Sequence, residues 1–196
     1  SLKEQRRRFI EYHESNPVIA SVAVYEAERD PCRPSNSVKL MAVRELLSDD
    51  MMLRNDYIIL CDIDTRIWSL GHIENLVADL NLYTRAFYPL NLQVLSGFLI
   101  LRCENHGALR WLLGAWITQY ESDVMRWGWY ADQVALSKVV VAADSKISVE
   151  SLSRLTTKRH FRWATRPGFL VNAWSHKGRD LWASNYTYRR NVLFLA

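Results

Sequence analysis

Two carboxylates one residue apart, Asp62 and Asp64, follow a short apolar run at residues 57–61 (YIILC). The run is too short for a typical helix and has no polar face, a pattern typical of a strand covered on both sides. Side chains at positions i and i+2 of a strand point the same way, so the two carboxylates can converge on one object. Such charges repel each other unless a cation or a proton lies between them, so we predict a site for Mg²⁺ or Mn²⁺. In open α/β sheets, ligands collect outside the carboxyl ends of the strands, where this pair falls.

The elements that must position this pair predict a sheet flanked by helices. An apolar, β-branched segment at 18–25 (VIASVAVY) predicts a first buried strand. A helix is expected from Ser37, and its apolar face is formed by Val38, Met41, Ala42 and Leu46. Lys39 lies off that face. Because a strand–helix–strand unit is nearly always a right-handed parallel crossover, we expect a single α/β domain over residues 1–196 with a mainly parallel, twisted sheet.

Another buried strand is predicted at 92–101 (LQVLSGFLIL), after a short helix at about 73–82. The pair Ser96-Gly97 interrupts this strand. A glycine inside a strand marks a bulge or a place where something approaches the backbone closely.

Two helices are expected next. The first begins at Asn105, and its apolar face is formed by Leu109, Leu112, Leu113, Trp116 and Tyr120. The second opens at Ala131-Asp132-Gln133, after an aromatic turn at 127–130. In that position Asp132 is either a helix cap or a functional carboxylate.

The last part of the chain is predicted to hold a weak strand and a short helix at 139–155, and a final strand at 169–174 (FLVNAW). The segment 175–179 (SHKGR) follows that strand, and a basic, aromatic tail extends over about 181–196.

Composition narrows the functional classes. The 196 residues contain eight Trp and nine Tyr, whose rings either fill the core or stack on a sugar or nucleotide ligand. The three cysteines are odd in number and widely spaced, which is typical of reduced thiols in a cytoplasmic protein. No apolar run is long enough to span a bilayer. A basic helix expected at 2–14 either presents a solvated face or contacts a membrane surface or partner.

Four motifs in this order resemble nucleotide-sugar glycosyltransferases of the GT-A fold, especially glycogenin-like and related retaining transferases. They are the D-x-D in CDIDTRIW at 61–68, the strand LSGFLI at 95–100, the pair Asp132-Gln133, and the late His176-Lys177-Gly178. The resemblance covers about residues 18–180. It implies a Rossmann-like sheet and a metal-dependent transfer of a sugar from a nucleotide-diphosphate donor.

The resemblance implies that Mn²⁺ or Mg²⁺ is held against the donor diphosphate by Asp62, Asp64 and His176. The metal would act as a Lewis acid on the leaving diphosphate. Lys177 and the backbone at Gly178 would bind phosphate, as a point charge and an unshielded N–H.

The same resemblance implies that other residues contact the sugar of the donor. Asp132 would orient the sugar or stabilise positive charge at the anomeric carbon, and Gln133 would assist by hydrogen bonding. Ser96 and Gly97 would let the sugar lie close to the backbone, and Lys39 is a further candidate donor contact. The acceptor would be a saccharide, a lipid or a protein, with retention at the anomeric carbon; a nucleic-acid partner is not expected.

Three departures from the family leave alternatives open. Leu95 stands where an Asn is common, only one strand–helix unit precedes the D-x-D, and the connection at 83–91 is compact. A non-catalytic binding or scaffold module on a degenerate transferase fold is therefore the main alternative. A D-x-D phosphatase would normally have Thr or Val where Arg66 stands. A metal nuclease would need a cluster of carboxylates and a lysine downstream, and the sequence has none of that type.

Overall fold

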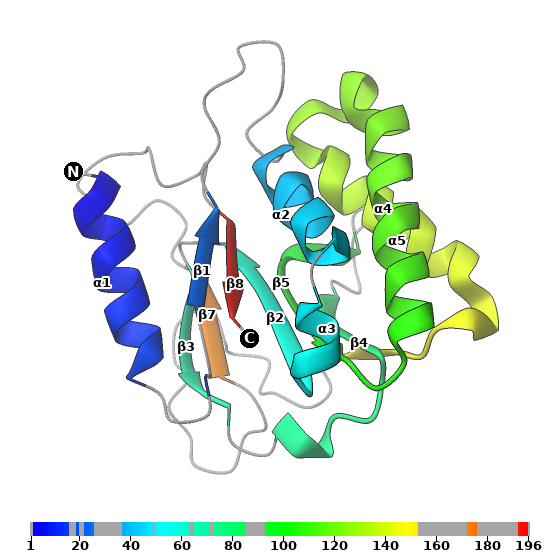
Figure 1. Cartoon of the computed structure of the whole chain (residues 1–196). Coiled ribbons are helices and arrows are strands. Elements are labelled where there is room, and N and C mark those ends of the chain that lie inside the picture. Colours follow the sequence, from blue (N-terminus) through cyan, green and yellow to red (C-terminus); the bar gives the residue numbers. More distant parts are fainter. Residues whose placement is uncertain are drawn as a thin grey trace.

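The computed structural model describes residues 2–15, 19, 22–25, 37–48, 50–62, 65–70, 73–84, 93–152, 172–175 and 192–195. These residues form a main sheet with helices packed against it, and a small second sheet (Figure 1). The expected α/β class is confirmed at this level. No helix in these ranges is both long and apolar enough to cross a membrane.

The helices are α1 (Leu2–Glu14), α2 (Ser37–Ser48), α3 (Met51–Arg54), α4 (His106–Trp127) and α5 (Ala131–Ala143), with 3-10 turns η1 (Ile73–Asn75), η3 (Gly128–Tyr130) and η4 (Asp144–Lys146). The strands are β1 (Val22–Tyr25), β2 (Tyr57–Asp62), β3 (Thr65–Ser69), β4 (Leu80–Thr84), β5 (Val94–Arg102), β6 (Val149–Ser151), β7 (Asn172–Ser175) and β8 (Val192–Leu195).

The main sheet has the order β1-β8-β2-β5-β4-β6, and β3 pairs with β7 in the small sheet. Among the described pairs only β4–β6 is parallel, so the prediction of a mainly parallel sheet is wrong for these residues. β1 and β2 do run in the same direction, but β8 lies between them, antiparallel to both. The apolar run of β2 reflects coverage on both faces, which a central antiparallel strand shares with a parallel one.

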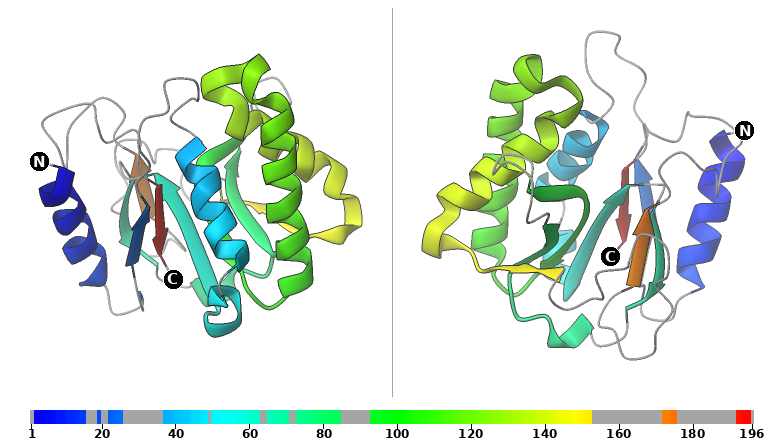
Figure 2. Two further views of the ribbon diagram at one scale, coloured as in Figure 1. Left: turned by 45° about the horizontal axis from the view of Figure 1, so that its top comes forward. Right: turned by 180° about the vertical axis from the view of Figure 1, so that it is seen from behind.

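Each face of the main sheet has its own core. Ile58 and Leu60 of β2 join the residues of α2, α4 and α5 on one face. Ile59 and Cys61 join Phe9 of α1 and residues of β3 and η1 on the other. The two views of Figure 2 agree with this division, because β3 and β7 lie on the side of the sheet away from α2.

Several local predictions are confirmed and others are wrong. Asn105 caps α4, since its side chain accepts a hydrogen bond from the N–H of Ala108, and the expected apolar face of α4 is buried. The helix expected at 73–82 is instead η1 followed by β4, because Leu80 and Leu82 alternate with Asn81 at the two-residue period of a strand.

In the last part of the chain, α5 continues to Ala143 and β6 covers Val149–Ser151, where a weak strand and a short helix were expected. Of the strand predicted at 169–174, the described residues Asn172–Ser175 form β7.

The buried face of α2 also differs from the prediction. Met41 is 47% exposed, whereas Lys39 is only 4% exposed. The helix turns Leu40, Ala42, Val43 and Leu46 into the core together with Lys39. A lysine joins this face because the fold supplies a buried partner for its charge, which periodicity alone does not reveal.

We expect Leu113→Ala on α4 to lower the free energy of unfolding by about 2–5 kcal/mol, because it leaves a cavity in the core. Leu113 is fully buried, whereas Leu53 on α3 is 59% exposed and provides the matched control. Leu53→Ala should change stability by no more than about 0.5 kcal/mol. Urea denaturation of both variants tests the assignment of the core, and equal losses would contradict it.

Cys103, which directly follows β5, generates a prediction about pH. Burial, and to a smaller extent the Asp56 carboxylate, raises the pKa of the Cys103 thiol to about 12. The ordinary pKa of a cysteine thiol is 9.0, so the stability from this shift is complete below that pH and is lost as the pH rises toward 12. Between pH 8 and pH 10.5, the free energy of unfolding should therefore fall less for Cys103→Ala than for the wild-type chain. An identical fall would contradict the shift.

Candidate functional site

Three side chains from separate parts of the chain meet beneath α2. The Lys39 Nζ of α2 lies 3.1 Å from Asp132 Oδ2 of α5 and 3.4 Å from Ser96 Oγ of β5. The Ser96 hydroxyl donates to the same Asp132 oxygen over 2.6 Å. We call these three residues the Lys39 cluster.

The cluster is almost completely removed from solvent. The side chains of Lys39 and Asp132 are 6% and 5% exposed, and Ser96 is 2% exposed as a residue. Buried charges are stable only when they are paired and hydrogen-bonded, and hydrogen bonds to an ionised carboxylate are among the strongest in proteins. The two donors on Asp132 Oδ2 therefore tie α2 and β5 to the first turn of α5.

Asp132 is not the cap of its helix, so that alternative is wrong. The N-cap of α5 is Tyr130, which makes no side-chain capping bond, and Asp132 is the second residue inside the helix. The preceding helix α4 ends at Gly128, whose positive φ of 50° suits a residue without a Cβ. Because α4 ends sharply, α5 begins with its N-terminus against β5. The dipole of α5 also favours a carboxylate at that end.

Ser96 reaches the cluster because β5 contains a bulge. Between the pairs Leu82–Leu99 and Tyr83–Leu95, β4 advances by one residue and β5 advances by four. The β5 residues passed over in this shift, 96–98, include Ser96-Gly97, where the glycine predicted either a bulge or a close approach to the backbone. As a result the side-chain alternation of β5 is reset, and Val94 and Leu99 join the core on the same face of the sheet.

The end of β2 lies beside this bulge. Cys61, the residue before Asp62, pairs with Phe98, the residue after Gly97. Asp62 is the last residue of β2, and its backbone also pairs with Val192 of β8.

Asp64, His176, Lys177 and Gly178 lie outside the described residues, as does the side chain of Asp62. Within the described ranges, no group of three or more His, Cys, Asp or Glu residues could hold a metal ion.

Gln133 and Gly97 are next to the cluster in sequence, and both are half-buried. Of the predicted donor-site residues, the structure therefore brings Lys39, Ser96 and Asp132 into direct contact, and it places Gly97 and Gln133 one residue away along the chain.

Sequence reasoning assigned Trp116 only to the apolar face of its helix, and missed a polar contact. The fully buried Trp116 donates its indole N–H to the backbone carbonyl of Asp132 over 2.9 Å. A signal was available, because a tryptophan on a buried helix face needs a partner for its N–H.

The arrangement joins a fixed carboxylate, a hydroxyl and an ammonium group. A carboxylate held in this way can accept hydrogen bonds from ligand hydroxyls or face a developing positive charge. The ammonium group can balance the carboxylate or attract an anionic ligand group.

A double-mutant cycle tests whether the Lys39 cluster is held by its charges. We expect Lys39→Met and Asp132→Asn each to lower the free energy of unfolding by about 3–5 kcal/mol, because each leaves a buried partner uncompensated. The double variant should lose clearly less than the sum of the two losses.

The exposed pair Asp50 and Arg54, whose charged atoms lie 3.9 Å apart, provides the control cycle. Its coupling should stay below about 1 kcal/mol, since both side chains are in water. Additive losses for Lys39 and Asp132 would contradict the assignment of a buried ion pair.

Comparisons with known proteins found no relative of this chain. No protein-family model, no curated protein and no solved structure matches this chain. The likeness to GT-A transferases thus consists of the four ordered motifs, and the function must be inferred from the residues of the chain itself.

Proposed function

We propose that this chain is a metal-dependent glycosyltransferase with a GT-A-like, Rossmann-related fold. It moves a sugar from a nucleotide-diphosphate donor to a saccharide, lipid or protein acceptor, with retention at the anomeric carbon. One observation carries the proposal. Ser96 and Asp132, which two of the motifs assign to the donor site, lie 36 residues apart in sequence, and they meet in one buried cluster with Lys39, a further candidate donor contact.

The position of the cluster also supports this function. A donor has to reach the metal through its diphosphate and the cluster through its sugar, so the two sites must be neighbours. The strand that ends at Asp62 is paired with the strand that carries Ser96. Asp62 and the pair Ser96-Gly97 thus belong to adjacent strands of one sheet.

In the proposed site, Asp132 accepts hydrogen bonds from the sugar or faces the positive charge that develops at its anomeric carbon. Gln133 adds a hydrogen bond to the sugar. A divalent cation bound by Asp62, Asp64 and His176 would neutralise the leaving diphosphate. 

Phosphate binding in the proposed site is the role of Lys177 and the backbone at Gly178. Ser96-Gly97 provides the close approach to the backbone, since the bulge leaves this part of β5 out of register with β4.

A non-catalytic scaffold built on the same fold is the second candidate. Asp132 is only 3% exposed and already accepts two hydrogen bonds from within the chain. A polar cluster with a purely structural role would have these properties, and the experiments below separate the two candidates.

Calorimetric titration with UDP and GDP, with and without Mn²⁺, tests the donor site directly. We expect binding only in the presence of Mn²⁺, because the carboxylates repel a diphosphate unless a cation lies between them. Asp64→Ala should weaken this binding by about tenfold or more. The matched control is Asp56→Ala, which removes an exposed carboxylate at the opposite end of β2.

Equal affinities of the Asp64→Ala and wild-type chains would contradict the metal assignment. Absence of binding under every condition would contradict the transferase proposal and favour the scaffold.

A second variant separates chemistry from donor binding. Asp132→Asn should lower the rate at which a nucleotide sugar releases its nucleoside diphosphate by about 10²–10³-fold, while the affinity for UDP with Mn²⁺ is retained. Asp123→Asn is the control, because Asp123 is 4% exposed and pairs with Lys138 instead. Equal rates for the two variants would remove Asp132 from the chemistry.

A further inference from the structure

We propose that Trp116 is a positioning residue that holds Asp132 against Lys39 and Ser96. This role goes beyond the packing of the core, and its functional consequence rests on the function proposed above. The starting point is the bond from the Trp116 indole N–H to the Asp132 carbonyl, 2.9 Å long and fully buried.

The bond fixes the backbone of Asp132, whose carboxylate accepts both hydrogen bonds of the Lys39 cluster. The carbonyl of Asp132 lies in the first turn of α5, and it has two lone pairs, one of which can serve the helix while the other accepts from Trp116. A backbone atom of Asp132 is thus fixed by α4, while its carboxylate is fixed by α2 and β5. With both ends held, the side chain has little freedom to rotate away from the cluster.

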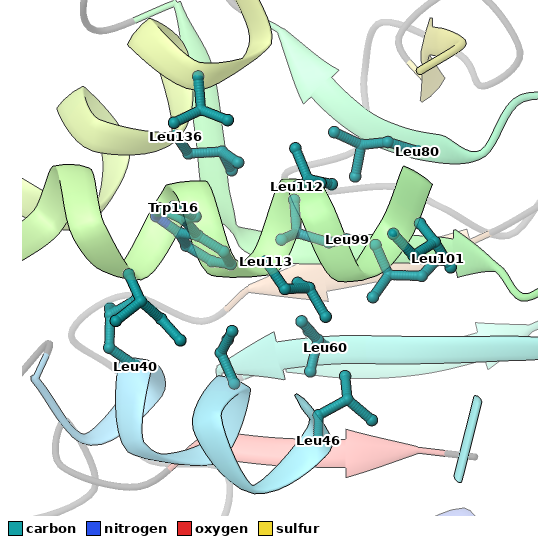
Figure 3. Packing of buried hydrophobic residues seen from close by; sticks show 14 of the residues in the cluster. Leu40, Leu46, Leu60, Leu80, Leu99, Leu101, Leu112, Leu113, Trp116 and Leu136 are labelled. Atoms are coloured by element: carbon teal, nitrogen blue, oxygen red, sulfur yellow. The ribbon is translucent and has the colours of Figure 1, made fainter. Parts of the chain in front are cut away.

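The ring of Trp116 lies in the same core as residues of the two helices that carry the ion pair. Figure 3 shows it between Leu40 of α2 and Leu136 of α5 in this view, and all three residues are buried. Leu40 directly follows Lys39 in sequence. Losing the Trp116 N–H would remove the hydrogen bond from α4 to the Asp132 backbone and leave apolar contacts, which have no direction, on that side of the turn, while Lys39 and Ser96 still bond the carboxylate.

The chain offers a matched control on the same helix. Trp127 packs against the same core, but within the described part of the chain its indole N–H has no hydrogen-bond partner. Trp127→Phe therefore removes a comparable ring and an N–H that fixes nothing. The pair Trp116→Phe and Trp127→Phe separates loss of the bond from loss of ring volume.

The test repeats the cycle of Lys39→Met and Asp132→Asn in both backgrounds. The coupling between Lys39 and Asp132 should fall to less than half its wild-type value with Trp116→Phe and stay unchanged with Trp127→Phe. Full coupling in the Trp116→Phe background would overturn the proposal and leave Trp116 as a core residue, whatever the loss in overall stability.

If Trp116→Phe does not fold, the wild-type ring still reports on the contact. With 5-fluorotryptophan in the eight positions, the Trp116 signal can be assigned by elimination from single Trp→Phe variants at the other positions. Lys39→Met should shift the ¹⁹F signal of Trp116 and leave that of Trp127 in place. No shift at Trp116 would overturn the proposal.

The functional readout uses UDP-glucose with Mn²⁺. Trp116→Phe should lower the rate of UDP release about tenfold without changing the affinity for UDP. The substitution loosens Asp132, which contacts the sugar in the proposed site, and leaves the proposed metal ligands unchanged. An unchanged rate would overturn the functional part of the proposal. If the wild-type chain does not bind UDP, the proposed function fails, and the coupling measurement still decides whether Trp116 positions Asp132.

Discussion

The buried ion pair between Lys39 and Asp132 is the constraint on which the helical half of the fold depends. Each charge would be strongly unfavourable in the core without the other, so the pair favours the arrangement of α2 and α5 on the sheet that joins them. Ser96 completes the requirement by donating to the same carboxylate oxygen. A hydrophobic core tolerates small shifts between its elements, whereas hydrogen-bonded charges impose distance and direction.

Backbone features deliver these three side chains to one point. The bulge in β5 resets the side-chain alternation of the strand, and Gly128 ends α4 sharply enough for α5 to begin against the sheet. A second polar contact, in which Lys138 of α5 and Gln119 of α4 bond the buried Asp123, holds the two helices together farther along. The cluster thus lies on rigid elements, which is what a site needs if it is to hold a ligand in a defined geometry.

The same properties bear on function. In the proposed function, the Asp132 carboxylate, which lies at a helix N-terminus beside the strand that pairs with β2, would meet the sugar close to a bound diphosphate. The near-complete burial of Asp132 means that it is preorganised before a ligand arrives, and preorganised charges contribute most to catalysis because they need no rearrangement during the reaction. Burial alone would serve a scaffold equally well, and the difference lies in whether a donor binds next to it.

Elements with local signals could be predicted from the sequence. The apolar run before Asp62 predicted β2, the spacing from Leu109 to Tyr120 predicted the buried face of α4, and Ser96-Gly97 indicated a special position in β5. Periodicity records which residues are buried, so it works where burial alone specifies the element. The direction of the strands, the inward turn of Lys39, and the partners of Asp132 and Trp116 became evident only in the folded chain. These depend on contacts between residues far apart in the chain, and a buried lysine has the same local pattern as a solvated one until the opposite charge is placed beside it.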